Sequence, residues 1–142
     1  MAHTRIRKFT TKEWYKGAQD LGAAEFCMAV RAGDRVFLRG QTGHDFDGVF
    51  HGLGDAGEQA EQAMRNVAVL LGEAGARLDH IAKITVYITD RAYREPVYQA
   101  IGRHLKGIHP CSTGLIVKGL ARPYMAMEID VEAVVPDEAA RP

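Results

Sequence analysis

The stretch Glu61–Asp90 reads EQAMRNVAVLLGEAGARLDHIAKITVYITD, and it decides the fold. Its first half belongs to a helical pattern that begins at Asp55, which has the capping-box spacing to Glu58. The pattern ends at Gly75, a residue that commonly stops helices. Apolar residues recur three and four positions apart, as one helix face requires: Ala60, Met64, Val67, Leu71 and Ala74. We therefore predict an amphipathic helix over 55–75.

The second half of the stretch changes to strict alternation. Ile84, Val86 and Ile88 point one way, and the polar or mixed residues between them point the other way. This period of two predicts a strand over 81–89 whose two faces meet different surroundings.

Shorter elements are predicted on both sides of this helix and strand. Gly33-Asp34 separates two short apolar runs within 26–41, which indicates a hairpin turn. The glycine-rich stretch that follows is predicted to be a functional loop. The other elements expected are a strand near 6–9, a helix over 96–106, and strands over 113–120 and 125–135.

Two helices and about six strands favour a two-layer α+β fold with a mixed sheet. Both helices are expected on one face of the sheet, because crossovers between parallel strands are right-handed. The other face is then left for a partner. The 142 residues fit one domain, 1–142, with a short mobile tail from about residue 136.

The composition excludes several classes of protein. Eighteen Lys and Arg residues balance eighteen Asp and Glu residues, so affinity for nucleic acid or for an anionic membrane is not expected. No apolar run approaches the length of about 20 residues that spans a bilayer. Cys27 and Cys111 form no C-x-x-C pair, which argues against structural zinc. We expect a cytoplasmic protein with reduced thiols.

The last predicted strand, MAMEIDVEAVV, carries Glu128, Asp130 and Glu132 at alternate positions. The three carboxylates therefore share one face, each about 6.5 to 7 Å from the next. An acid or base beside a ligand is one interpretation of this pattern. A solvated or ion-paired sheet face is the other.

The stretch GIHPCSTGLIV, 107–117, raises the question of a nucleophile. A reactive Cys111 would need a base and an orienting group. A serine hydrolase elbow reads G-x-S-x-G, and the first glycine is missing from PCSTG. The alternative is a turn led by Pro110, whose neighbouring hydroxyl groups satisfy the loop backbone.

Histidines and aspartates gather in the glycine-rich loop, where a metal site is conceivable: His44, Asp45, Asp47 and His51. Their spacing matches no established ligand pattern. No metal and no cofactor is therefore predicted.

Several segments together resemble the Rid family, also called the YjgF/YER057c/UK114 family. They are RGQTG at 39–43, the stretch 61–90, HPCSTGLIV at 109–117 and MEIDVEAVV at 127–135. The resemblance implies a chorismate-mutase-like fold, a homotrimer and ligand clefts between subunits. Well-studied family members hydrolyse enamines and imines such as 2-aminoacrylate, and others are described as ribonucleases or translation inhibitors.

This chain departs from the family pattern at the positions that matter for chemistry. The family's arginine, which would pair with a substrate carboxylate, falls on Ser112. The first residue of the family's serine-glycine-glutamine turn falls on Arg39, a cation that can replace the missing arginine as the partner of the substrate carboxylate. The hairpin tyrosine falls on Phe26, and the glutamate that positions water falls on Asp130.

The resemblance thus implies a cleft with these candidate catalytic residues: Asp130, Ser112 and Cys111. It implies a second set for substrate binding: Phe26, Arg39, Gly40, Gln41, Pro110, Thr113 and Glu132. The partner expected is a small carboxylate-bearing molecule. The first hypothesis is a hydrolase or deaminase that is not a standard 2-iminopropanoate deaminase, because the arginine is missing. The second is a metabolite-binding protein without turnover, and the third, an activity on RNA, is disfavoured by the neutral charge.

Overall fold

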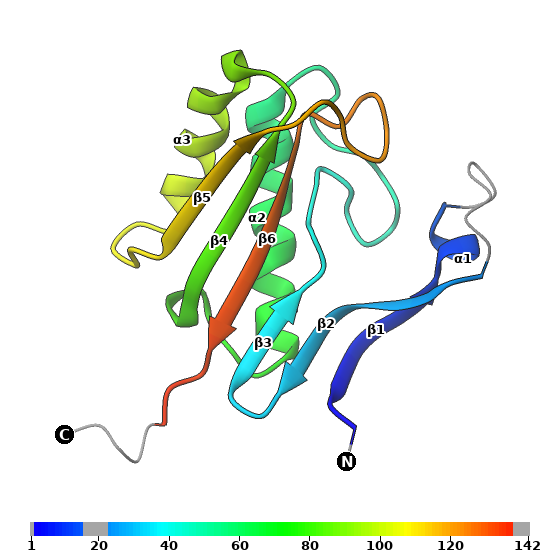
Figure 1. Cartoon of the computed structure of the whole chain (residues 1–142), viewed down its shortest axis with the longest axis vertical. Helices are drawn as coiled ribbons and strands as arrows, with labels where there is room; N and C mark the ends of the chain where they lie inside the picture. The colour runs from blue at the N-terminus through cyan, green and yellow to red at the C-terminus, as the bar shows by residue number, and fades with distance from the viewer. Residues whose placement is uncertain (1, 16–22, 138–142) are drawn as a thin grey trace.

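The computed structural model describes residues 2–15 and 23–137, and its centre is one six-stranded sheet with the order β1-β2-β3-β6-β4-β5 (Figure 1). Every neighbouring pair is antiparallel except β4 and β5, which are parallel. The strands are β1 (Thr4–Thr10), β2 (Glu25–Ala32), β3 (Arg35–Leu38), β4 (Ile81–Ile88), β5 (Cys111–Ile116) and β6 (Met127–Val134). The helices are α1 (Thr11–Tyr15), α2 (Ala56–Glu73) and α3 (Arg94–His104), with 3-10 turns η1 (Leu78–His80) and η2 (Arg91–Tyr93).

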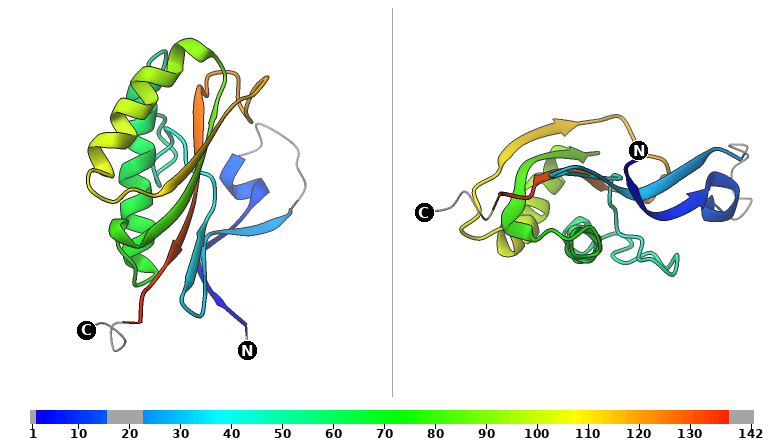
Figure 2. Two further views of the ribbon diagram at one scale, coloured as in Figure 1. Left: turned by 60° about the vertical axis from the view of Figure 1, so that its left-hand side comes forward. Right: turned by 90° about the horizontal axis from the view of Figure 1, so that it is seen from below.

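Helices α2 and α3 lie side by side on one face of the sheet (Figure 2). This confirms the predicted mixed α+β layers. The core fills the space between these helices and the sheet, and its largest fully buried side chains include Met64, Leu70, Leu71, Ile88 and Ile129. We call the opposite side of the sheet the open face, because neither of the two long helices covers it.

Helix α2 begins and ends as its sequence predicts. The side chain of Asp55 accepts a hydrogen bond from the backbone N–H of Glu58 at 3.1 Å, which caps the first turn. The helix stops before Gly75, whose φ of 76° lies in the left-handed region that glycine adopts without strain. The Gly33 turn between β2 and β3 uses the same property, with φ of 64°.

The alternation in β4 and β6 separates the core from the open face as expected. Ile84, Val86 and Ile88 are buried under the helices, as are Ile129 and Val131. The residues between them on both strands are more exposed. The three carboxylates of β6 therefore lie together on the open face, as predicted.

Some boundaries differ from the sequence prediction. Strand β5 runs over Cys111–Ile116 rather than 113–120, because its partner β4 ends at Ile88 and offers no further ladder beyond the bond from Val117 N to Ile88 O. Helix α3 starts at Arg94, ahead of the Pro96 expected in its first turn. The short helix α1 was not predicted.

The tail expected to be mobile from about residue 136 lies outside the described residues apart from Pro136 and Asp137. Within the described ranges, none of the helices has both the length and the apolar character required to cross a membrane.

Candidate functional site

The predicted carboxylate Asp130 lies near the middle of the open face. It pairs with Thr85 across β6 and β4, and Tyr87 on β4 donates a hydrogen bond from its Oη to Asp130 Oδ2 at 2.8 Å. A hollow of about 340 Å³ borders Asp130, and Lys83, Thr85 and Glu132 also line it. The hydrogen bond to Asp130 raises the pKa of Tyr87, which keeps the phenol protonated as the donor.

Glu128 is the next carboxylate along β6 and is half-buried. Burial raises the pKa of Glu128, the charge of Asp130 raises it further, and Arg39 opposes the shift. The glutamate packs directly on Gly40, where a Cβ would overlap Glu128 Oε2 and would lie 2.8 Å from its Cδ. Glycine at position 40 therefore makes room for the carboxyl group of Glu128.

Arg39 follows the end of β3, and its guanidinium is directed toward α1. Its Cζ lies 5.1 Å from the ring centre of Phe9 and 5.3 Å from that of Trp14. Its Nη2 also donates to Tyr15 Oη at 3.4 Å. Phe26, the predicted hairpin residue, is 56% exposed and lies 6.2 Å from Phe9 between ring centres. The side chain of Arg39 is thus held by aromatic rings.

Gln41 has a structural role in this chain. Its backbone exchanges two hydrogen bonds with Ile129, each 2.9 Å, and its side-chain Nε2 donates to the carbonyl of Arg39 at 2.9 Å. The residue is 4% exposed. The amide that was predicted to bind substrate is therefore engaged in fixing the backbone that carries Arg39.

The register of β5 divides the predicted PCST residues between the two faces. Thr113 pairs with Thr85, which places it on the same face as Asp130, and Cys111 shares that face two residues earlier. Ser112 pairs with the buried Ile84 and so lies on the helix side of the sheet. Cys111 is an exposed free thiol, whereas Pro110 is partly buried just before the strand. The structure does not bring Ser112 together with Asp130.

The histidines of the glycine-rich loop contact different partners. His51 Nε2 lies 2.8 Å from Asp45 Oδ2, and the hydrogen bond from His51 lowers the pKa of Asp45. His44 instead packs edge-on against Phe50 with ring centres 4.8 Å apart. Over the ranges 2–15 and 23–137, no group of three or more His, Cys, Asp or Glu side chains is arranged to hold a metal ion.

Sequence reasoning missed several residues of this region. Tyr87 is one of the residues between Ile84, Val86 and Ile88 that the alternation places on the other face, but nothing in its position showed that it would bond Asp130. Trp14, Arg122 and Tyr124 come from segments with no periodic pattern, and only folding brings them near Arg39. The sequence signal available was weak: one arginine and two aromatic residues in otherwise irregular segments.

The sequence of the chain is similar to a known protein family and to several known proteins. The family model described as Endoribonuclease L-PSP matches residues 18–135. Protein DfrA of Myxococcus xanthus is 31% identical over 114 residues, which cover 80% of this chain and 86% of that protein. Protein MMF1, mitochondrial, of Saccharomyces cerevisiae is 25% identical over 112 residues, or 79% of this chain and 74% of that protein.

A solved structure agrees with these matches. The crystal structure of Rv2704, a YjgF/YER057c/UK114 family member from Mycobacterium tuberculosis, superimposes with a TM-score of 0.76 at 25% identity. The match covers 94% of this chain and 100% of that chain. The two chains therefore share their fold over nearly their whole length.

Proposed function

Since the chain belongs to the YjgF/YER057c/UK114 family, also described as Endoribonuclease L-PSP, we propose that it hydrolyses an imine or enamine in a small carboxylate-bearing metabolite. The observation that carries this proposal is the 2.8 Å hydrogen bond from Tyr87 Oη to Asp130 Oδ2. It fixes the orientation of a carboxylate on the open face, beside a hollow of about 340 Å³.

The chemistry needs a base that is held in place. Water adds to the carbon of the C=N bond and loses a proton as its oxygen bonds to that carbon, and Asp130 is the candidate to accept this proton. The proton that Asp130 took up passes to nitrogen, and the second proton of the added water follows as the C=O bond forms, so that ammonia leaves. Tyr87 occupies one oxygen of Asp130, which leaves the other oxygen for the water. An enamine enters the same route after its carbon takes up a proton to give the imine.

Arg39 is the candidate to hold the substrate carboxylate. In the described part of the chain, no Asp or Glu oxygen lies within 4.0 Å of its guanidinium. Glu128 is near enough for Arg39 to act on its pKa, but it forms no ion pair with Arg39 at that distance. A guanidinium without a carboxylate partner of this kind can form a charge-assisted pair with a ligand carboxylate.

The proposal includes a homotrimer with the ligand cleft between subunits. Apolar side chains remain exposed on the open side and on the outer strand, notably Phe26 at 56%, Leu115 at 44% and Ile116 at 41%. A second copy of the chain would remove this surface from water. Light scattering should then give about three times the chain mass of 15.6 kDa. A monomer at micromolar concentration would refute the trimer.

Standard 2-iminopropanoate deamination is not part of the proposal. The resemblance puts the family's arginine position on Ser112, and the pairing of β5 with β4 puts Ser112 on the helix side of the sheet. Without that guanidinium, a very small substrate loses a two-pronged contact that orients it for attack by water. An activity on RNA has no support from the charge, because the eighteen basic residues are balanced by eighteen acidic ones.

The cytoplasm is the proposed compartment. It suits the free thiols of Cys27 and Cys111. The yeast relative is named as mitochondrial, so fractionation of the native cells is the direct test.

A thermal-shift screen of small carboxylates and imine precursors tests the function. For each imine precursor that raises the melting temperature, an amino-acid oxidase then generates the imine in the presence of the protein, and NMR follows the products. Formation of keto acid and ammonia faster than in buffer supports the hydrolase. A precursor that stabilises the protein while its imine decays only at the buffer rate supports the alternative, a binding protein without turnover.

A further inference from the structure

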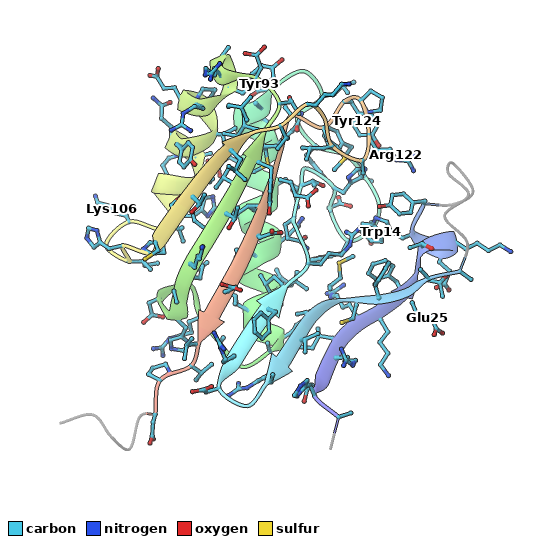
Figure 3. All side chains as sticks on the ribbon, in the orientation of Figure 1. Trp14, Glu25, Tyr93, Lys106, Arg122 and Tyr124 are labelled. Atoms are coloured by element: carbon cyan, nitrogen blue, oxygen red, sulfur yellow. The ribbon has the colours of Figure 1, made fainter. Side chains whose placement is uncertain are left out.

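A cavity of about 350 Å³ lies beside the open face, between α1 and the loop 121–125. We call it the α1 cavity. Its size is at the lower end of pockets that hold small molecules, which range over about 300–1,000 Å³. Figure 3 shows Trp14, Arg122 and Tyr124 on the same flank of the molecule. The residues that line it include Trp14, Tyr15, Arg39, His44, Arg122 and Tyr124.

Two guanidinium groups line this cavity, and aromatic rings hold both of them. Arg39 lies over Trp14 at 5.3 Å from the ring centre, and Arg122 lies over Tyr15 at 4.9 Å. Across residues 2–15 and 23–137, neither guanidinium has a carboxylate oxygen within 4.0 Å. Aromatic faces position a cation but leave its charge uncompensated. The cavity is therefore prepared for an anion.

His44 contributes no further positive charge. Burial lowers its pKa first, and the charges of Arg122 and Arg39 lower it further. Both cations therefore lie near enough to His44 to lower its pKa. The ring of His44 is held at both nitrogens, with Nδ1 3.1 Å from Thr42 Oγ1 and Nε2 3.2 Å from Tyr124 Oη.

Glu128 also lines the cavity, next to Arg39, and restricts which anion fits. Burial and the neighbouring charge of Asp130 raise the pKa of Glu128. The lining thus combines two guanidinium groups with one carboxyl group. This charge balance favours a ligand with a single carboxylate over a dianion such as phosphate.

We propose that the α1 cavity binds a small aromatic carboxylic acid, with Arg39 and Arg122 pairing with its carboxylate and Trp14, Tyr15 and Tyr124 bordering its planar ring. The idea rests on the proposed function in one respect, because it makes this cavity the place where the carboxylate of the substrate is held. It adds a substrate class, aromatic acids, and a second cation, Arg122.

Calorimetry with benzoate as the probe tests the proposal without any need for turnover. Two comparison compounds are titrated in the same way: benzamide lacks the negative charge of benzoate, and cyclohexanecarboxylate lacks its planar ring. Benzoate should bind at least about tenfold more tightly than benzamide, because a charge-assisted contact is lost. It should also bind more tightly than cyclohexanecarboxylate. Trp14 is the chain's single tryptophan, so its fluorescence should report the same titration from within the cavity.

Matched arginine variants locate the site. Arg122→Gln should weaken benzoate binding by about tenfold or more, and Arg122→Lys should weaken it less because the charge remains. Arg65→Ala is the control: this arginine lies on α2, away from the cavity, and donates to Gln62. Its affinity for benzoate should equal that of the parent chain. Circular dichroism confirms that each variant is folded.

Any one of three results would overturn the proposal. The first is that the parent chain does not bind benzoate at millimolar concentration. The second is that Arg122→Gln binds benzoate as tightly as Arg65→Ala does, and the third is that inorganic phosphate binds more tightly than benzoate with the same dependence on Arg122. A chain that binds benzoate but hydrolyses no imine would leave this inference standing and would refute only the hydrolase.

Discussion

Replacing Gln59 with methionine should loosen the loop that carries Arg122 and Tyr124. Gln59 lies on α2, is 1% exposed, and bonds to two separate loops. Its Nε2 donates to the carbonyl of Gly52 at 2.9 Å and to that of Tyr124 at 3.2 Å. Its Oε1 accepts from the backbone N–H of Ala126 at 2.8 Å.

The magnitude follows from these three contacts. A typical buried hydrogen bond contributes a net 0.5–1.5 kcal/mol, so the three together are worth about 1.5–4.5 kcal/mol. Methionine fills nearly the same volume and recovers roughly 1 kcal/mol through apolar burial. The free energy of unfolding should therefore fall by about 0.5–3.5 kcal/mol for Gln59→Met, with a midpoint of about 2 kcal/mol. At about 2–4 °C per kcal/mol for a chain of this size, the melting temperature should drop by roughly 1–14 °C.

The assay is thermal and urea unfolding at one fixed protein concentration, followed by benzoate calorimetry. Gln62→Met is the matched control, because Gln62 is also buried on α2 but, among the described residues, its side chain bonds to those of Asn66 and Arg65 and to no loop. The free energy of unfolding should fall by only about 1 kcal/mol in Gln62→Met. Equal losses in the two variants, or unchanged benzoate affinity in Gln59→Met, would show that Gln59 does not position the loop.

Two further substitutions test the surroundings of the site. The hydrogen bond from His104 lowers the pKa of Glu61 below its usual 4.5, so this contact stabilises the folded chain above about pH 4.5 and is lost as pH falls through the lowered pKa. In urea titrations, the difference in unfolding free energy between the parent and Glu61→Gln should therefore narrow from pH 7 toward about pH 3. A difference that does not depend on pH would contradict this. Gly40→Ala should displace the carboxyl group of Glu128, because a Cβ at position 40 would overlap Glu128 Oε2. Benzoate binding should weaken by about tenfold at nearly unchanged helix content. Unchanged affinity would show that Glu128 does not shape the cavity.

The period of the apolar residues predicted those helices and strands that have one buried face along their whole length. Helix α2 has one buried face, and β4 and β6 each have one buried and one open face, so Ile84 and Asp130 fell on the correct sides. The end of β5 could not be predicted in this way, since it depends on where the partner strand β4 stops. The sequence of residues 117–120 alone continues to look like a strand.

The α1 cavity was beyond sequence reasoning for a different reason. Trp14, Arg39, His44 and Arg122 come from four segments, and each belongs to a short helix, a strand end or a loop. No periodic signal links such positions. For Gln41 the family motif predicted substrate binding. In the structure its side-chain amide instead donates a hydrogen bond to the carbonyl of Arg39.

The rate of imine decay with and without Asp130 tests the central claim most directly. An amino-acid oxidase generates the imine of phenylalanine in place, and its loss is followed with the parent chain and with Asp130→Asn at equal concentrations. The parent should accelerate hydrolysis above the buffer rate, and Asp130→Asn should lose about a hundredfold or more of that acceleration while remaining folded, since a general base contributes roughly 10²–10⁴. No acceleration by the parent chain, or equal acceleration by Asp130→Asn, would contradict the assignment of Asp130 as the base of a hydrolase.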